Sequence, residues 1–197
     1  MGAVKVLTTS FAELQQNAIR DQRKPRFHGN GFVQLYLDDV NRLHVYHPDL
    51  VAVRVANARI HDHRWTFHSK VLIGTLGHQT YDIVPTDFGR WSAKEVPGAS
   101  NKEVPLQEVP NSRCEIYLTG HYDIVAGSSY VFSRRNFHKS HHSGITMTFI
   151  EKRCDDGNPA RVISPYGEVP DHAFAVQPPE QDLWTAIKDA FALWNKQ

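Results

Sequence analysis

The chain has 197 residues, 41% of them hydrophobic and 22% charged, and a formal net charge of +1. This composition predicts one globular domain over residues 1–197, and its near-neutral charge argues against nucleic acid or a membrane as a partner. The two cysteines, Cys114 and Cys154, lack metal-binding spacing, and the first residues lack the apolar core of a secretion signal, so we expect a cytoplasmic protein with reduced thiols.

The first predicted element is an amphipathic helix over residues 10–23, where Ser10 and Glu13 form a capping box. The apolar side chains on its expected buried face are Phe11, Leu14, Ala18 and Ile19. Residues 31–37 and 42–46 then alternate in polarity around a polar turn, which predicts a hairpin.

A single strand is predicted over residues 51–63, because valines at 51, 53 and 55 continue in the same parity to Arg59, His61 and His63. Side chains two residues apart share one face of a strand. Two further strands are expected over 71–74 and 78–84, separated by glycines.

Residues 85–112 carry four prolines and little periodicity, which predicts a long loop. Such a loop acts as a lid, a binding loop or a partner contact, or is surface decoration. Further predicted strands cover residues 114–119, 122–125, 129–132 and 144–152. Residues 155–180 are expected to form a tail before a C-terminal amphipathic helix. The apolar stripe of this helix, which packs on the sheet or forms a dimer contact, is Leu183, Trp184, Ile187, Phe191 and Trp194.

Many short strands with helices only at the ends predict an all-β sandwich or barrel. Its core covers about residues 31–153, preceded by the helix at 10–23 and followed by the tail and helix at 155–197. The sequence contains no internal repeat and no second domain.

The histidine pair His61 and His63 is the strongest chemical signal in the sequence. Two imidazoles on one face of a strand form two ligands for a divalent metal. A third ligand is expected at His138. Imidazole binds Fe, Zn, Cu and Ni alike, so the residue types do not identify the metal.

Two sequence blocks resemble the two motifs of the cupin superfamily. Residues 61–74 contain the H-x-H pair and end in Gly74, the glycine of the first motif. Residues 127–142 begin with the glycine of the second motif and place His138 at its histidine ligand. In this second block Ser133 and Arg135 occupy the usual proline and glycine positions, and His142 replaces the final asparagine. The resemblance covers roughly the central half of the chain and implies a jelly-roll, or double-stranded β-helix, fold.

The first motif departs from the family pattern at its glutamate ligand, because Phe67 stands there and cannot bind metal. His61, His63 and His138 would then form a neutral three-histidine site, like that of the thiol dioxygenases. A one-residue bulge would make His68 a fourth ligand. His142 is expected either to hydrogen-bond a ligand histidine or to be exposed.

The resemblance implies a metal-dependent enzyme, with a non-haem Fe(II) dioxygenase as the leading chemistry and Zn, Ni or Mn as alternative metals. The substrate would be a small polar molecule, such as a thiol or an acid. Arg59 would orient an anionic group or form a salt bridge. Tyr81 would point into the barrel as a phenol donor or pack in the core, and Trp65 and Phe67 would form apolar walls.

Two other classes of function stay open at this point. One is a non-redox cupin, namely an isomerase, epimerase or lyase that acts on a sugar or nucleotide-sugar. The other is a binding protein without turnover, because the sequence around the H-x-H pair also resembles small cupin-like proteins of bacteria and bacteriophages. Such a protein could form a homodimer through its strands or terminal segments.

Overall fold

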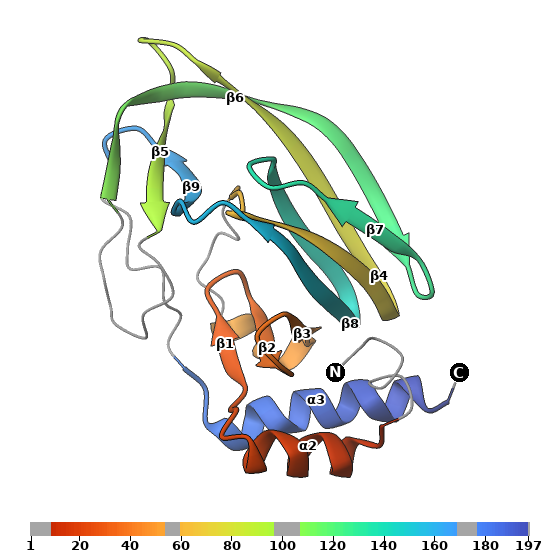
Figure 1. Ribbon diagram of the computed structural model, residues 1–197. Helices are drawn as coiled ribbons and strands as arrows, with labels where there is room; N and C mark the ends of the chain where they lie inside the picture. Colours follow the sequence, from red (N-terminus) through yellow and green to blue (C-terminus); the bar gives the residue numbers. More distant parts are fainter. Residues whose placement is uncertain (1–8, 54–59, 97–106, 169–176, 197) are drawn as a thin grey trace.

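The protein forms one curled antiparallel sheet with two helices packed at one end, as the computed structural model shows (Figure 1). The structure describes residues 9–53, 60–96, 107–168 and 177–196. Eight of the nine strands in this part of the chain follow the order β1-β2-β3-β8-β4-β6-β5-β9, and the ninth, β7, pairs with β4. The predicted all-β, barrel-like class is confirmed, since the sheet curls into a half-barrel.

The strands are β1 Arg26–His28, β2 Phe32–Tyr36, β3 Asn41–Tyr46, β4 Trp65–Pro85, β5 Trp91–Val96, β6 Gln107–Val125, β7 Ser129–Phe132, β8 Phe137–Asp155 and β9 Ala160–Pro165. The helices are α2 Phe11–Arg20, α3 Glu180–Trp194 and the short 3-10 helix η1 Pro48–Val53. The two longest pairings are those of β4 with β8 and with β6, and they form the curved wall that carries the candidate site.

Helix α2 begins at the predicted capping box, in which Ser10 and Glu13 bond each other's backbone. Leu14 and Ala18 are buried, whereas Ile19 is 64% exposed, so its predicted place on the buried face is wrong. At about 100° per residue, Ile19 lies roughly 100° around the helix from the centre of the buried stripe. Helix α3 confirms the predicted apolar stripe, and its side chains join those of α2 and the β1–β3 strands in the largest core cluster.

The predicted hairpin is confirmed as the antiparallel pair β2 and β3. The predicted strand over 51–63 is wrong in the described parts of this range, because Pro48–Val53 is the 3-10 helix η1 and residues 60–63 form only the isolated bridges of His61. Proline favours the first position of a helix, and Asp49 places a negative charge in the first turn. Residues 54–59, including Arg59, lie outside the described residues.

Residues 65–85 form one long strand, β4, instead of two strands separated by glycines. Gly74 has a φ of +74°, and the pairing with β8 shifts register once before it and once across it. Such irregularities bend a strand without ending it, which explains why the chain continues through Gly74. Gly77 pairs in regular register with both neighbouring strands.

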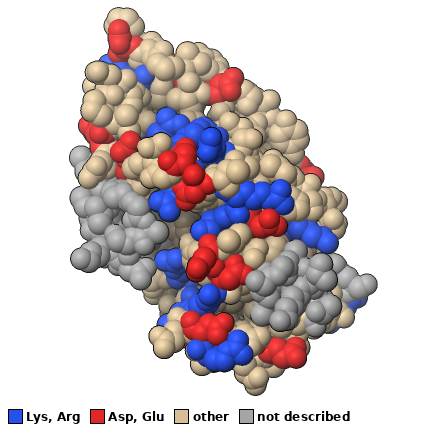
Figure 2. Space-filling view, in the orientation of Figure 1, with Lys and Arg blue, Asp and Glu red and all other residues tan. Residues whose placement is uncertain are grey.

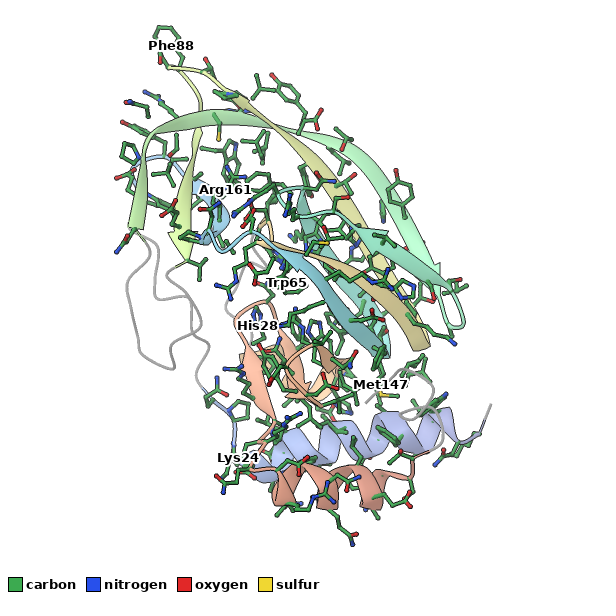
Figure 3. All side chains as sticks on the ribbon, in the orientation of Figure 1. Lys24, His28, Trp65, Phe88, Met147 and Arg161 are labelled. Carbon is green, nitrogen blue, oxygen red and sulfur yellow. The ribbon has the colours of Figure 1, made fainter. Side chains whose placement is uncertain are left out.

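The predicted long loop at 85–112 and the predicted tail at 155–180 both contain strands. Within the described part, β5 pairs with β6 on one side and with β9 on the other. The turn before β5 carries Phe88, which lies at the far tip of the sheet, away from His28 and Trp65 (Figure 3). The pairing of β5 with β9 joins segments distant in sequence, which no local polarity pattern indicates.

Acidic and basic side chains alternate over the face drawn in Figure 2, consistent with the net charge of +1. Among the described residues, none of the helices has the length and hydropathy required to cross a membrane.

Gly74→Ala should destabilise the fold by about 3 kcal/mol, because the new Cβ combines positive-φ strain with overpacking. That Cβ would lie 2.5 Å from the Ile145 carbonyl oxygen and 2.6 Å from the Thr146 hydroxyl. Gly144→Ala is the control, since Gly144 has a φ of +70° with nothing within 4 Å of an added Cβ. It should cost about 1 kcal/mol in urea unfolding, so equal losses would contradict the steric argument.

Candidate metal centre

A backbone bridge brings the two predicted motifs together. The His61 amide donates to the His138 carbonyl at 3.0 Å, and the His138 amide donates to the His61 carbonyl at 2.9 Å. This antiparallel bridge fixes the two residues directly opposite each other. The Arg135 amide donates to the His63 carbonyl at 2.9 Å, which holds the second histidine of the pair against the same loop.

The imidazoles of His61, His63 and His138 converge on one point. Their ligand nitrogens all lie within 4.8 Å of one another, and the Nε2 atoms of His63 and His138 are 2.9 Å apart. Two ligands at about 2.0–2.1 Å from one ion lie roughly 2.9–3.4 Å apart, so the spacing fits coordination to a common ion. The three histidines could therefore bind a metal ion.

Burial keeps this cluster in the protonation state that a metal needs. Burial lowers the pKa of His63 and of His138 well below the ordinary value, and the neighbouring His61 lowers both further. Ligand histidines must be neutral to offer a lone pair to a metal. At neutral pH the His63 and His138 rings are therefore neutral, and they could bind a cation without first losing protons.

The cluster lines a small cavity with mostly apolar walls. The described residues around it are Asn30, Phe32, His44, Tyr46, His61, His63, Trp65, Phe67, Leu76, Tyr130, His138, Ser140, Thr148 and Ile150. Trp65 and Phe67 are walls, as predicted, and the Phe67 ring lies 5.2 Å from that of His63. The cavity volume is about 40 Å³, which suits an ion with a few water molecules or a small ligand.

Asp62, between the two ligand histidines, points away from them and is fully buried. Its carboxylate accepts from the Arg161 backbone at 2.6 Å and from Arg161 Nε at 2.8 Å, and Arg135 Nη1 lies 3.8 Å away. Arg135 also donates to Asp156 at 2.8 Å. These charge-assisted bonds anchor the His61–His63 segment to β9 and to the loop before His138. Figure 3 shows Arg161 projecting from the β9 side of the sheet.

Arg135 adopts a backbone conformation that is usual for glycine. Its φ is +67°, a left-handed conformation that glycine adopts at little cost and other residues rarely adopt. The bond from its side chain to Asp156 and the one from its amide to His63 hold this conformation. Arg135 thus tightens the turn that presents His138.

Three further residues contribute to the site, and no pattern in the sequence indicated them. The Asn30 side-chain nitrogen lies 3.2 Å from His61 Nε2. His44 lines the cavity and lies within hydrogen-bond distance of Gln34, at 3.2 Å. The His78 ring is tilted against that of His138, with 4.8 Å between the ring centres. Burial lowers the pKa of His78 to about 4. The period-two pattern of residues 42–46 placed His44 on one face of a strand, but nothing in the sequence indicated that this face meets the metal site.

The remaining predicted site residues lie elsewhere. Tyr81 donates to Gln79 at 2.8 Å and packs in a separate apolar cluster with Phe137. Since Phe137 and His138 are consecutive in β8, they point to opposite faces, so Tyr81 does not face the cavity. His142 Nδ1 lies 2.8 Å from the Gly144 carbonyl, outside the described cavity lining.

His68 is half-buried and alternates with Phe67, which places it on the other face of β4. It is not part of the histidine cluster, so the bulge that would make it a fourth ligand does not occur. Arg59 falls outside the described residues, and its expected role stays a prediction.

No known protein-family model matches this chain, and no curated protein sequence is significantly similar to it. Any function must therefore be argued from the residues themselves.

Asp62→Asn should destabilise the protein by about 2 kcal/mol, because it removes a charge that several bonds solvate in the interior. It should also weaken metal binding by about tenfold, as expected when a support of the segment that carries His61 and His63 is lost. Urea unfolding and metal titration measure the two effects.

Asp155→Asn is the matched control. Asp155 forms a half-exposed ion pair with Arg64 at 3.1 Å, so its loss should cost less than about 1 kcal/mol. An Asp62→Asn variant with unchanged stability and unchanged metal affinity would rule out the anchoring role.

Proposed function

We propose that this chain is a cupin-like metalloprotein whose three-histidine centre binds Fe(II), and that it is a non-haem dioxygenase acting on a small polar substrate. The observation that carries the proposal is the convergence of three imidazoles, His61, His63 and His138, on a cavity that Phe67 also lines. In the cupin motif that the sequence resembles, the position of Phe67 holds a carboxylate ligand. When bound there, Fe(II) would supply the activation of dioxygen.

The donor set favours an open and positively charged centre. Three neutral imidazoles leave the charge of a divalent ion uncompensated, so an anionic group of a substrate, such as a thiolate or carboxylate, would be attracted to it. The described lining contains no lysine, arginine, aspartate or glutamate that would compete for this role. Substrate charge would thus be recognised mainly by the metal.

The surrounding side chains would exclude water and orient the substrate. Trp65, Phe67 and Ile150 form apolar walls, which lower the local dielectric and strengthen polar contacts inside the cavity. Ser140 and Thr148 add hydroxyl groups to the lining, and the Asn30 amide holds the His61 ring. These groups would position a short substrate beside the three histidines.

The cavity also weighs against a nucleotide-sugar as the substrate. Sites for ligands of that size have volumes of roughly 300 Å³ or more, whereas this cavity has about 40 Å³.

His138→Ala should abolish iron binding at this centre and reduce oxygen consumption at least about a hundredfold, because one of three ligands is lost. The protein is purified without oxygen, reconstituted with Fe(II), analysed for metal by mass spectrometry and assayed for oxygen uptake with a panel of small thiols and carboxylates. His61→Ala should behave in the same way.

His68→Ala is the control, since it removes a histidine of β4 that lies outside the cluster. It should retain both iron and activity. Tight zinc with no oxygen uptake on any compound would contradict the dioxygenase. Substrate conversion without oxygen would indicate the non-redox class, and binding without conversion would indicate a ligand-binding protein.

A further inference from the structure

A second group of metal-ligating side chains lies on the opposite face of the curved sheet. His121 and Asp123 come from β6 and His141 comes from β8, and all three are exposed. Their ligand atoms lie within 4.8 Å of one another. The His121 and His141 rings are 5.2 Å apart, and His121 Nε2 is 4.0 Å from an Asp123 carboxylate oxygen.

The strand register produces this cluster. β6 and β8 lie on either side of β4, so their backbones are about 10 Å apart. Gly77 of β4 pairs with Asp123 on one side and with His141 on the other. His121 stands two residues before Asp123 on the same face of β6. Three donors from two non-adjacent strands therefore surround one glycine.

Gly77 supplies the space that lets these donors meet. A Cβ built on Gly77 would lie 2.0 Å from His141 Nε2 and 2.2 Å from its Cε1. The His141 imidazole thus lies flat over the Gly77 backbone and reaches across β4 toward β6. Any side chain at position 77 would occupy the place of this ring.

We propose that His121, Asp123 and His141 form a second divalent-metal site, which binds ions of the Zn²⁺ class. Two imidazoles and one carboxylate are a donor set that Zn²⁺ accepts, with water completing the coordination. The carboxylate offsets part of the ionic charge, which the inner three-histidine centre does not do. The bound ion would link β6 to β8 across β4 and leave a coordination position open to solvent.

The two sites lie on opposite faces of β4. His78 is the neighbour of Gly77 and points inward, where its ring lies 4.8 Å from that of His138. Gly77 and the three outer donors face the other way. Loss of one site should therefore leave the other intact, and the proposal does not depend on the function of the inner centre.

The test is calorimetric titration of the full chain with ZnCl₂ alone. His141→Ala should bind one Zn²⁺ fewer per chain than the wild type. His138→Ala should retain the outer ion, and His68→Ala should bind as the wild type does. Zn²⁺ should also raise the thermal stability of His138→Ala, because a ligand that binds only the folded state stabilises it.

Gly77→Ala tests whether the outer site depends on the space over β4 as well as on its three donors. It keeps all three ligands but fills the space under His141, so it should weaken the outer site at least about tenfold while the inner site is unchanged. Gly144→Ala, whose added Cβ meets nothing, should leave both sites unchanged. Circular dichroism of each variant verifies folding, and Asp123→Asn, an exposed change, gives an independent loss of affinity.

Equal Zn²⁺ stoichiometry and affinity in the wild type, His141→Ala and Asp123→Asn would overturn the proposal. Wild-type affinity in Gly77→Ala would also overturn it, because the site would then not depend on the gap over β4.

Discussion

The buried carboxylate of Asp62 is the interaction on which the inner site depends. It is fully buried, and bonds from Arg161 and the nearby Arg135 solvate its charge. A buried charge without such partners is strongly destabilising, so the segment can adopt few other positions. Because Asp62 stands between His61 and His63, its side chain sets the direction of both imidazoles. The salt-bridge network on one side of this segment thus fixes the arrangement of the histidines on the other.

The centre departs from ordinary core packing in a way that suits a functional site. His44, His63, His78 and His138 are buried or half-buried in one region, and burial holds the pKa of all four below the usual value. The Nδ1 atoms of His78 and His138 are buried without a hydrogen-bond partner among the described residues. Buried unsatisfied polar atoms are rare in folded proteins and are concentrated where function requires them.

Local sequence rules predicted the elements whose partners are close in the chain. The capping box of α2, the β2–β3 hairpin and the apolar stripe of α3 all follow from short-range patterns. The same rules missed β5 and β9, which pair with each other although they lie far apart in the chain. They also divided β4 at its glycines, because a glycine that bends a strand and a glycine that ends one look alike in sequence.

By itself, the sequence identified the three histidines that the structure brings together: the spacing of His61 and His63 predicted two side chains on one face, and the resemblance of residues 127–142 to the second cupin motif pointed to His138. The same resemblance would put a carboxylate ligand where Phe67, which cannot bind metal, stands. The tertiary structure decided what surrounds these ligands. It brought in Asn30, placed Tyr81 on another face and assembled three outer donors over Gly77. The alternation of side chains along a strand is a local property of the backbone. Which side chains meet across a curled sheet depends instead on strand pairings between distant segments.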